Sequence, residues 1–229
     1  MAVLGFETST PVCSVALADA DRVLGEYTLE LGGHHSERLL PMSERLLQDA
    51  GIGISELEGV SVASGPGSFT GLRIGMSTAK GLCLALDFPL LPIPTLAGMA
   101  FQVAYDGMPV CAMLDARRGE VYAGVYRLEG RRLLSVAADA AVSMEDLLPC
   151  LPRPVLFVGD GAQVHRSRIL SSLDSDAFFV PRPFSHPTAA SIALLGAVKL
   201  NEGATVDACL AEPCYLRRTQ AERAREDKG

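Results

Sequence analysis

The chain has 229 residues, of which 48% are hydrophobic and 21% charged, and this balance excludes an intrinsically disordered chain. Its length suits two compact lobes of about 100 residues each better than one domain. The formal net charge of −7 excludes a general basic surface, so any RNA must be held largely by a partner.

Three short segments joined by tight turns open the chain. Their alternation predicts an antiparallel meander of strands over 3–7, 13–18 and 23–29. Helices and strands then alternate, and we expect them over 36–48, 59–64, 71–86, 90–93 and from residue 95 onward. The first half therefore has the order βββαβα.

The second half repeats this order. Strands are predicted over 110–115, 120–126, 131–136 and 155–158, and helices over 162–173 and 187–200. An acid, Glu7 or Asp115, ends the first strand of each half, although the surrounding residues share little identity. We therefore predict a duplicated α/β fold with lobes at 1–100 and 101–229, the last segment being able to pack back on the first lobe.

A glycine-rich loop lies between the strand over 59–64 and the following helix. It is not a P-loop, because Leu72 and Arg73 stand where a lysine and a hydroxyl residue are required. In the helix, Gly71, Gly75 and Ala79 recur every four residues and form a face of small side chains. That face suits close helix packing, and residue chemistry leaves two readings open: packing within the lobe or contact with a partner.

Histidines and cysteines give no metal or catalytic constellation in the sequence. His34 and His35 lack further ligands at suitable spacing, and the six cysteines form no Cys-x-x-Cys pair. The cysteines indicate buried thiols in a reducing compartment, and no run reaches the roughly 20 apolar residues that a bilayer span needs. We expect a cytoplasmic protein with no membrane segment. The mixed charges of the tail from Arg217 to Lys228 favour a solvated helix end over an RNA contact.

Several motifs together resemble one family. They span nearly the whole chain, in order: 6–10, the loop from Ser64 to Gly75, the Asp-Ala-Arg-x-Gly-Glu-Val-Tyr run over 115–122, Gly159-Asp160-Gly161 and 213–217. The chain is identified by them as a member of the TsaB (YeaZ) family. The resemblance implies an actin-like (ASKHA, ribonuclease H-like) two-lobed fold. It also implies a non-catalytic role in forming threonylcarbamoyladenosine (t6A) at position 37 of tRNAs that read codons beginning with A.

The resemblance also implies partners. In the family the chemistry belongs to a related subunit, TsaD, and the ATPase TsaE joins the complex. This implies that the chain contacts tRNA only through that complex. It also implies that the free chain forms a homodimer. The partner surface uses helices of the first lobe. The candidate contacts here are Leu39, Leu40, Ser43, Leu47, Arg73, Ile74, Gly75, Met76 and Ser77.

The resemblance further implies a vestigial nucleotide cleft between the lobes. By position, its residues are Glu7, Ser9, Thr10, Asp115, Arg117 and Gly159. We expect no catalytic residue, no metal and no cofactor of the chain's own, with ATP and Mg²⁺ belonging to the assembled complex. Glu7 departs from the aspartate that relatives commonly have, and its longer side chain would displace any magnesium ligand.

Three alternatives remain. A sugar- or acetate-kinase-like phosphotransferase shares the fold class but needs a phosphate-binding turn and a catalytic base. The turn over residues 7–11 has neither glycine nor lysine. A peptidase of the glycoprotease class needs metal ligands. The third alternative is a dimeric scaffold unrelated to RNA, and only identification of the partner can distinguish it from the family role.

Overall fold

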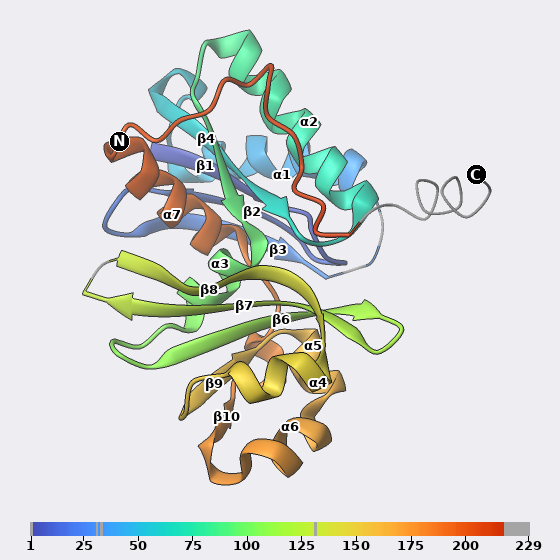
Figure 1. Ribbon diagram of the computed structural model, residues 1–229. Coiled ribbons are helices and arrows are strands. Elements are labelled where there is room, and N and C mark those ends of the chain that lie inside the picture. Colours follow the sequence, from blue (N-terminus) through green and yellow to red (C-terminus); the bar gives the residue numbers. More distant parts are fainter. Residues whose placement is uncertain (1, 31, 33, 131, 218–229) are drawn as a thin grey trace, which may run out of the picture.

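The protein is described from a computed structural model that covers residues 2–217, except 31, 33 and 131. Two β-sheets with helices form two lobes, one above the other in Figure 1. Most of the charged tail, residues 218–229, lies outside the described residues, so the expectation of a solvated helix end there stays a prediction. Among the described residues, no helix combines the length and apolar character that crossing a membrane requires.

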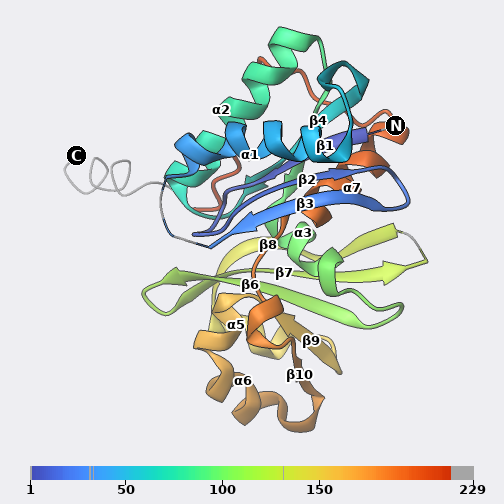
Figure 2. The ribbon, with the colours of Figure 1, turned by 180° about the vertical axis from the view of Figure 1, so that it is seen from behind.

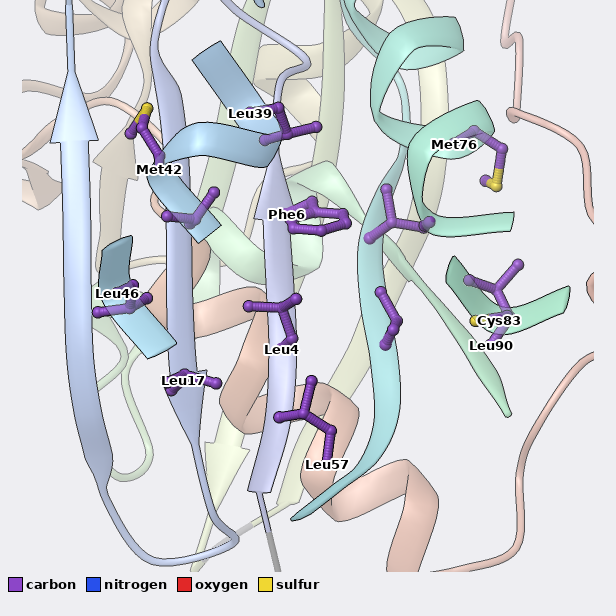
Figure 3. Packing of buried hydrophobic residues seen from close by; sticks show 14 of the residues in the cluster. Leu4, Phe6, Leu17, Leu39, Met42, Leu46, Leu57, Met76, Cys83 and Leu90 are labelled. Atoms are coloured by element: carbon purple, nitrogen blue, oxygen red, sulfur yellow. The ribbon is translucent and has the colours of Figure 1, made fainter. Parts of the chain in front are cut away.

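The first sheet has the strand order β3-β2-β1-β4-β5, antiparallel from β1 to β3 and parallel from β1 to β5. Helices α1 and α2 cover its outer face, and their apolar side chains meet those of the sheet (Figure 3), including Phe6, Leu39 and Met76. Burial of this face stabilises the lobe. The elements are β1 Ala2–Glu7, β2 Cys13–Ala18, β3 Val23–Leu29, α1 His35–Ala50, β4 Leu57–Gly65, α2 Phe69–Leu86 and β5 Leu90–Pro94.

The second sheet, in the order β10-β9-β6-β7-β8, repeats this topology: a three-stranded meander continued by two parallel strands. Its elements are β6 Pro109–Arg117, β7 Glu120–Glu129, β8 Arg132–Ser143, α4 Met144–Leu147, β9 Val155–Val158, α5 Asp160–Val164, α6 Arg166–Leu173 and β10 Ala177–Phe179. The predicted duplicated α/β fold is confirmed. Short 3₁₀ helices lie at Ile54–Glu56, Leu148–Cys150, Asp174–Asp176 and Arg182–Phe184.

The last helix of each half, α3 (Thr95–Val103) and α7 (Ala189–Asn201), lies between the two sheets (Figures 1 and 2). Helix α7 packs on β1, β2 and β4, and α3 packs on β6 and β7. Gly5 of β1 allows this approach, because a Cβ atom there would lie 2.8 Å from the Ala193 Cβ. At the start of α7, Ser14 Oγ and Glu26 Oε1 accept hydrogen bonds from the amides of Ala189 and Ala190.

After α7 the chain runs back over the first lobe. Residues 206–217, here called the strap, follow α2 (Figure 1). The Val206 amide donates to the Leu90 carbonyl (2.9 Å), and the Cys214 amide donates to the Ser64 carbonyl (2.6 Å). Between them, Lys80 Nζ donates to the Ala211 carbonyl (2.9 Å). These bonds fix the strap along the whole length of α2.

Several elements differ from the prediction. The helix expected over 162–173 is two helices, α5 and α6, which meet at His165. Strand β8 continues to Ser143, and the three-residue strand β10 was not expected. Helix α1 agrees with the expected 36–48 and runs through Pro41, which lies on its exposed side.

Candidate functional site

A cleft of about 810 Å³ lies between the lobes. The turn after β1, the glycine loop before α2 and the turn after β6 all contribute to its walls, and α1 closes it near His34 and His35. A second hollow, of about 510 Å³, shares Thr10 and Asp160 with it. Of the six predicted cleft residues, the structure places Ser9, Thr10, Asp115 and Arg117 on the cleft wall.

The glycine loop is fitted to the turn after β1. The Ser68 amide donates to the Ser9 carbonyl (2.6 Å), and a Cβ at Gly67 would lie 2.4 Å from that same oxygen. One helical turn later, the Thr8 hydroxyl donates to the Gly71 carbonyl (2.8 Å). The small residues here therefore serve contacts within the first lobe.

The second lobe presents a tight polar turn to the cleft. Asp115 Oδ1 accepts from the Arg117 amide (2.9 Å), and Asp160 Oδ1 accepts from the Asp115 amide (3.0 Å). Arg117, Arg118 and Gly119 have positive φ angles of 63°, 58° and 82°. This turn holds the exposed Arg117 side chain at the cleft wall.

Gly159 is a correction to the predicted cleft, since it is absent from the cleft wall and packs on β6. Its φ of 110° and the 1.9 Å that would separate its Cβ from the Met113 carbonyl oxygen both require glycine. Its role is to let α5 approach the sheet.

Glu7 is the second correction. Alternation along β1 places Glu7 on the same face as Gly5, toward α7, so its carboxyl is fully buried and does not line the cleft. Burial raises its pKa from 4.5 to about 7, although hydrogen bonding to Ser9 partly opposes the shift. Oε1 accepts from the Ser9 amide (2.5 Å), and Oε2 has no hydrogen-bond partner among the described residues. A carboxyl so placed cannot reach a metal ion in the cleft.

The two neighbouring histidines each contact another residue of the first lobe. His35 Nε2 lies 3.0 Å from the Thr10 carbonyl, and His34 Nδ1 lies 3.3 Å from Glu37 Oε2. Within the described part of the chain, no group of three or more His, Cys, Asp or Glu side chains is arranged to hold a metal ion. Both histidines line the cleft wall, and His35 joins α1 to the turn after β1.

The predicted partner residues divide by exposure. Leu40, Arg73 and Ser77 are exposed and Ile74 is half-buried. Ser43 and Leu47 are largely buried but line a surface groove between α1 and α2. The remaining three are buried in the first lobe, which corrects their assignment as surface contacts: Leu39, Gly75 and Met76. At Gly75 a Cβ would lie 2.3 Å from Thr8 Oγ1. The face of Gly71, Gly75 and Ala79 is therefore packed within the lobe, which decides between the two readings left open by the sequence.

Between the same two helices, part of the surface is open to solvent. A groove of about 590 Å³ lies between α1 and α2, and apolar side chains such as Leu40, Ile54 and Leu82 line it. Beside it on α2, Gly81 is exposed, and a Cβ there would meet no atom within 4 Å. Leu40, Ser43 and Leu47 of the predicted partner residues line this groove, whereas the open position at Gly81 was not predicted.

Sequence reasoning also missed what the end of the strap does. Arg217 Nη1 lies 3.1 Å from both the Ala116 carbonyl oxygen and Glu120 Oε2, so it joins the strap to the turn after β6. Two of the motifs noted in the sequence, 115–122 and 213–217, thus meet in space. No periodicity connects them, because they lie in separate elements far apart along the chain.

Comparison with known proteins agrees with this architecture. The family model described as TsaD, tRNA N6-adenosine threonylcarbamoyltransferase, matches residues 29–225. A Bacillus subtilis (strain 168) protein named tRNA threonylcarbamoyladenosine biosynthesis protein TsaB is 35% identical over 226 residues, covering 97% of this chain and 96% of that protein.

Solved structures give the fold class. YeaZ from Pseudomonas aeruginosa superposes with a TM-score of 0.82 at 32% identity, over 94% of this chain and 99% of that one. The ROK hexokinase of Thermus thermophilus, at 13% identity, shares the fold alone, with a TM-score of 0.50 over 89% of this chain and 100% of that one. The two lobes therefore have the actin-like fold, and the chain belongs to the TsaB (YeaZ) family.

Proposed function

We propose that this chain is the non-catalytic partner subunit of a cytoplasmic complex that forms threonylcarbamoyladenosine at position 37 of tRNAs reading codons beginning with A. It binds and supports a catalytic subunit of the TsaD type, and the ATPase TsaE joins them. The observation that carries the partner role is the apolar groove between α1 and α2.

The groove has the properties of a docking surface. Leu40 is 50% exposed and Ile54 43% exposed, so burying both against another protein would remove apolar surface from water. The open position at Gly81 lets a helix approach α2 closely. In the absence of the catalytic subunit, the same groove pairs two copies of the chain.

The burial of Glu7 supports a role without chemistry. Glu7, the acid that ends the first strand, points into the core. The residues of the turn that follows it form hydrogen bonds with one another and with the glycine loop. Ser9, Thr10, Asp115 and Arg117 do reach the cleft, which is the feature that favours the phosphotransferase alternative. Glu7 cannot serve that alternative as a base, because it does not face the cleft.

The charge of the chain supports indirect contact with RNA. With a net charge of −7, the chain has no general excess of cations to neutralise phosphates. The complex therefore meets tRNA mainly through the catalytic subunit.

Reconstitution tests the proposal. The cognate TsaD and TsaE, a threonylcarbamoyl-adenylate synthase, threonine, bicarbonate, ATP and unmodified tRNA are combined with and without this chain, and the modified nucleoside is measured by mass spectrometry. We expect product that requires both this chain and TsaD. Product formed by this chain and the synthase without TsaD would assign the chemistry to this chain. Product unaffected by omission of the chain would favour the independent scaffold or the phosphotransferase.

A further inference from the structure

The lobes are joined by more than the two covalent crossings, which run through residues 104–108 and 180–188. The first crossing enters β6 at Pro109, while the strap reaches the opposite end of that strand, at Ala116. The second crossing follows β10, which is separated from β6 by β9. The Arg217 contact is thus additional to these crossings and to the packing of α3 and α7 between the sheets, and it lies at the end of β6 that borders the cleft.

The strap is held firmly on the first-lobe side. Tyr215 packs on Phe69 with ring centroids 5.2 Å apart, and its hydroxyl accepts a hydrogen bond from Arg73 Nε (3.2 Å). The Arg73 guanidinium also lies 4.0 Å from the Phe69 ring centroid. Since Phe69 and Arg73 are one turn apart on α2, the strap is fixed to a single helix face two residues before Arg217.

The second-lobe side of the contact is the turn that carries Arg117. Arg217 Nη1 donates to the Ala116 carbonyl and pairs with Glu120, so it grips this turn at both ends. Both ion-pair side chains are partly shielded, with Arg217 20% and Glu120 40% exposed. An ion pair between flexible surface side chains contributes little to stability. Here, however, Arg217 extends from an anchored segment and also donates a hydrogen bond to a backbone carbonyl.

We infer that the strap is a latch, in which Arg217 holds the turn of residues 115–120 against the first lobe and thereby sets the width of the cleft. Release of Arg217 leaves the lobes joined by the two covalent crossings and by the packing of α3 and α7 between the sheets. The turn of residues 115–120 then moves away from the first lobe more readily, and both walls of the cleft become more accessible. The latch is a property of the free chain and does not depend on the proposed role in tRNA modification.

Hydrogen exchange followed by mass spectrometry tests the latch on the full chain. Arg217→Ala removes both contacts, and we expect roughly three- to tenfold faster exchange in residues 115–120 and in the glycine loop over 65–71. Glu120→Gln removes the ion pair but keeps the bond to the Ala116 carbonyl, so its effect is smaller. Arg168→Ala is the matched control, because its ion pair with Glu145 lies within the second lobe.

The outcomes separate a latch from ordinary loss of stability. Faster exchange confined to the two cleft walls, with α6 unchanged, supports the latch. Unchanged exchange in residues 115–120, or a rise spread evenly over all peptides, overturns it. Trypsin supplies a second measurement, because Arg117 and Arg118 are themselves cleavage sites in the turn; the latch predicts faster cleavage there in Arg217→Ala than in Arg168→Ala.

Discussion

The hydroxyl of Thr8 donates a hydrogen bond to the carbonyl of Gly71 and occupies the space where Gly75 would carry a side chain. One residue of the turn after β1 therefore touches two successive turns of α2. This contact makes the inner face of α2 intolerant of larger residues, whereas the outer face at Gly81 is open.

Replacing each of these two glycines by alanine should have opposite effects. Gly75→Ala forces a methyl group against Thr8 Oγ1, and we expect the free energy of unfolding to fall by about 2 kcal/mol. Gly81→Ala meets no neighbour and reduces the freedom of the unfolded chain, so we expect a gain of about 0.5–1 kcal/mol. Urea denaturation of both variants checks this. Equal effects at the two positions would contradict the orientation of α2.

The buried carboxyl of Glu7 should make stability depend on pH. Its pKa is about 7 in the folded chain, whereas the ordinary value of 4.5 applies to the unfolded chain. Between pH 4.5 and 7 the folded state therefore holds a proton that the unfolded state has lost. Stability should therefore fall as pH rises from about 4.5 to 7, by at most about 3 kcal/mol, and change no further above that range.

The isosteric variant Glu7→Gln isolates this effect, because it cannot ionise. Both proteins are denatured at pH 5, 6, 7 and 8. As pH rises, we expect the free energy of unfolding of the variant to increase relative to that of the natural chain. Parallel stability curves would mean that Glu7 titrates normally or not at all in this range.

The apolar groove between α1 and α2 should control self-association. Leu40→Glu places a charge in the groove, and we expect the dimer to weaken at least tenfold, about 1.4 kcal/mol. Leu170→Glu is the matched control, since Leu170 is 40% exposed on α6 of the second lobe. Analytical ultracentrifugation over a concentration series measures both. A dimer that survives Leu40→Glu but dissociates in Leu170→Glu would move the interface to the second lobe.

Thiol reactivity should divide the six cysteines into two groups. Cys13, Cys83 and Cys111 are buried, but Cys150, Cys209 and Cys214 are exposed, which corrects the expectation from the sequence that the cysteines are buried thiols. Burial raises the pKa of Cys83 to about 11 and that of Cys111 to about 12, so little thiolate forms there at neutral pH. Ellman's reagent should titrate three thiols rapidly and the other three only after denaturation. Rapid reaction of more than three would show that the core of one of the lobes opens readily.

Strand alternation and turn residues were sufficient to predict the two meanders. The bounds of β2 and β3 agree with the expected 13–18 and 23–29, because their turns carry clear breakers. Strand β10 was missed since it has three residues, too few to show a period. The break at His165 was missed because the residues on either side of it are all compatible with a helix.

The site was harder to predict than the fold. Helical spacing identified the small-residue face of α2 but could not say whether the sheet or a partner covers it. The position of Glu7 at the end of a strand suggested that its side chain enters the cleft. However, side chains alternate along β1, so Glu7 lies on the same face as Gly5, toward α7. The Arg217 contact depends on how the strap crosses the first lobe, which is a tertiary feature without a local signal.

The position of α7 between the sheets has a consequence for synthesis on the ribosome. The inner face of β1 and β2 is made first, but the helix that covers it begins at Ala189 and emerges on the order of ten seconds or more later. Until then Gly5 faces no neighbour from α7, and Ser14 and Glu26 have no amides of that helix to accept from. The inner face of the first sheet therefore stays incompletely covered until residues 189–201 have been translated.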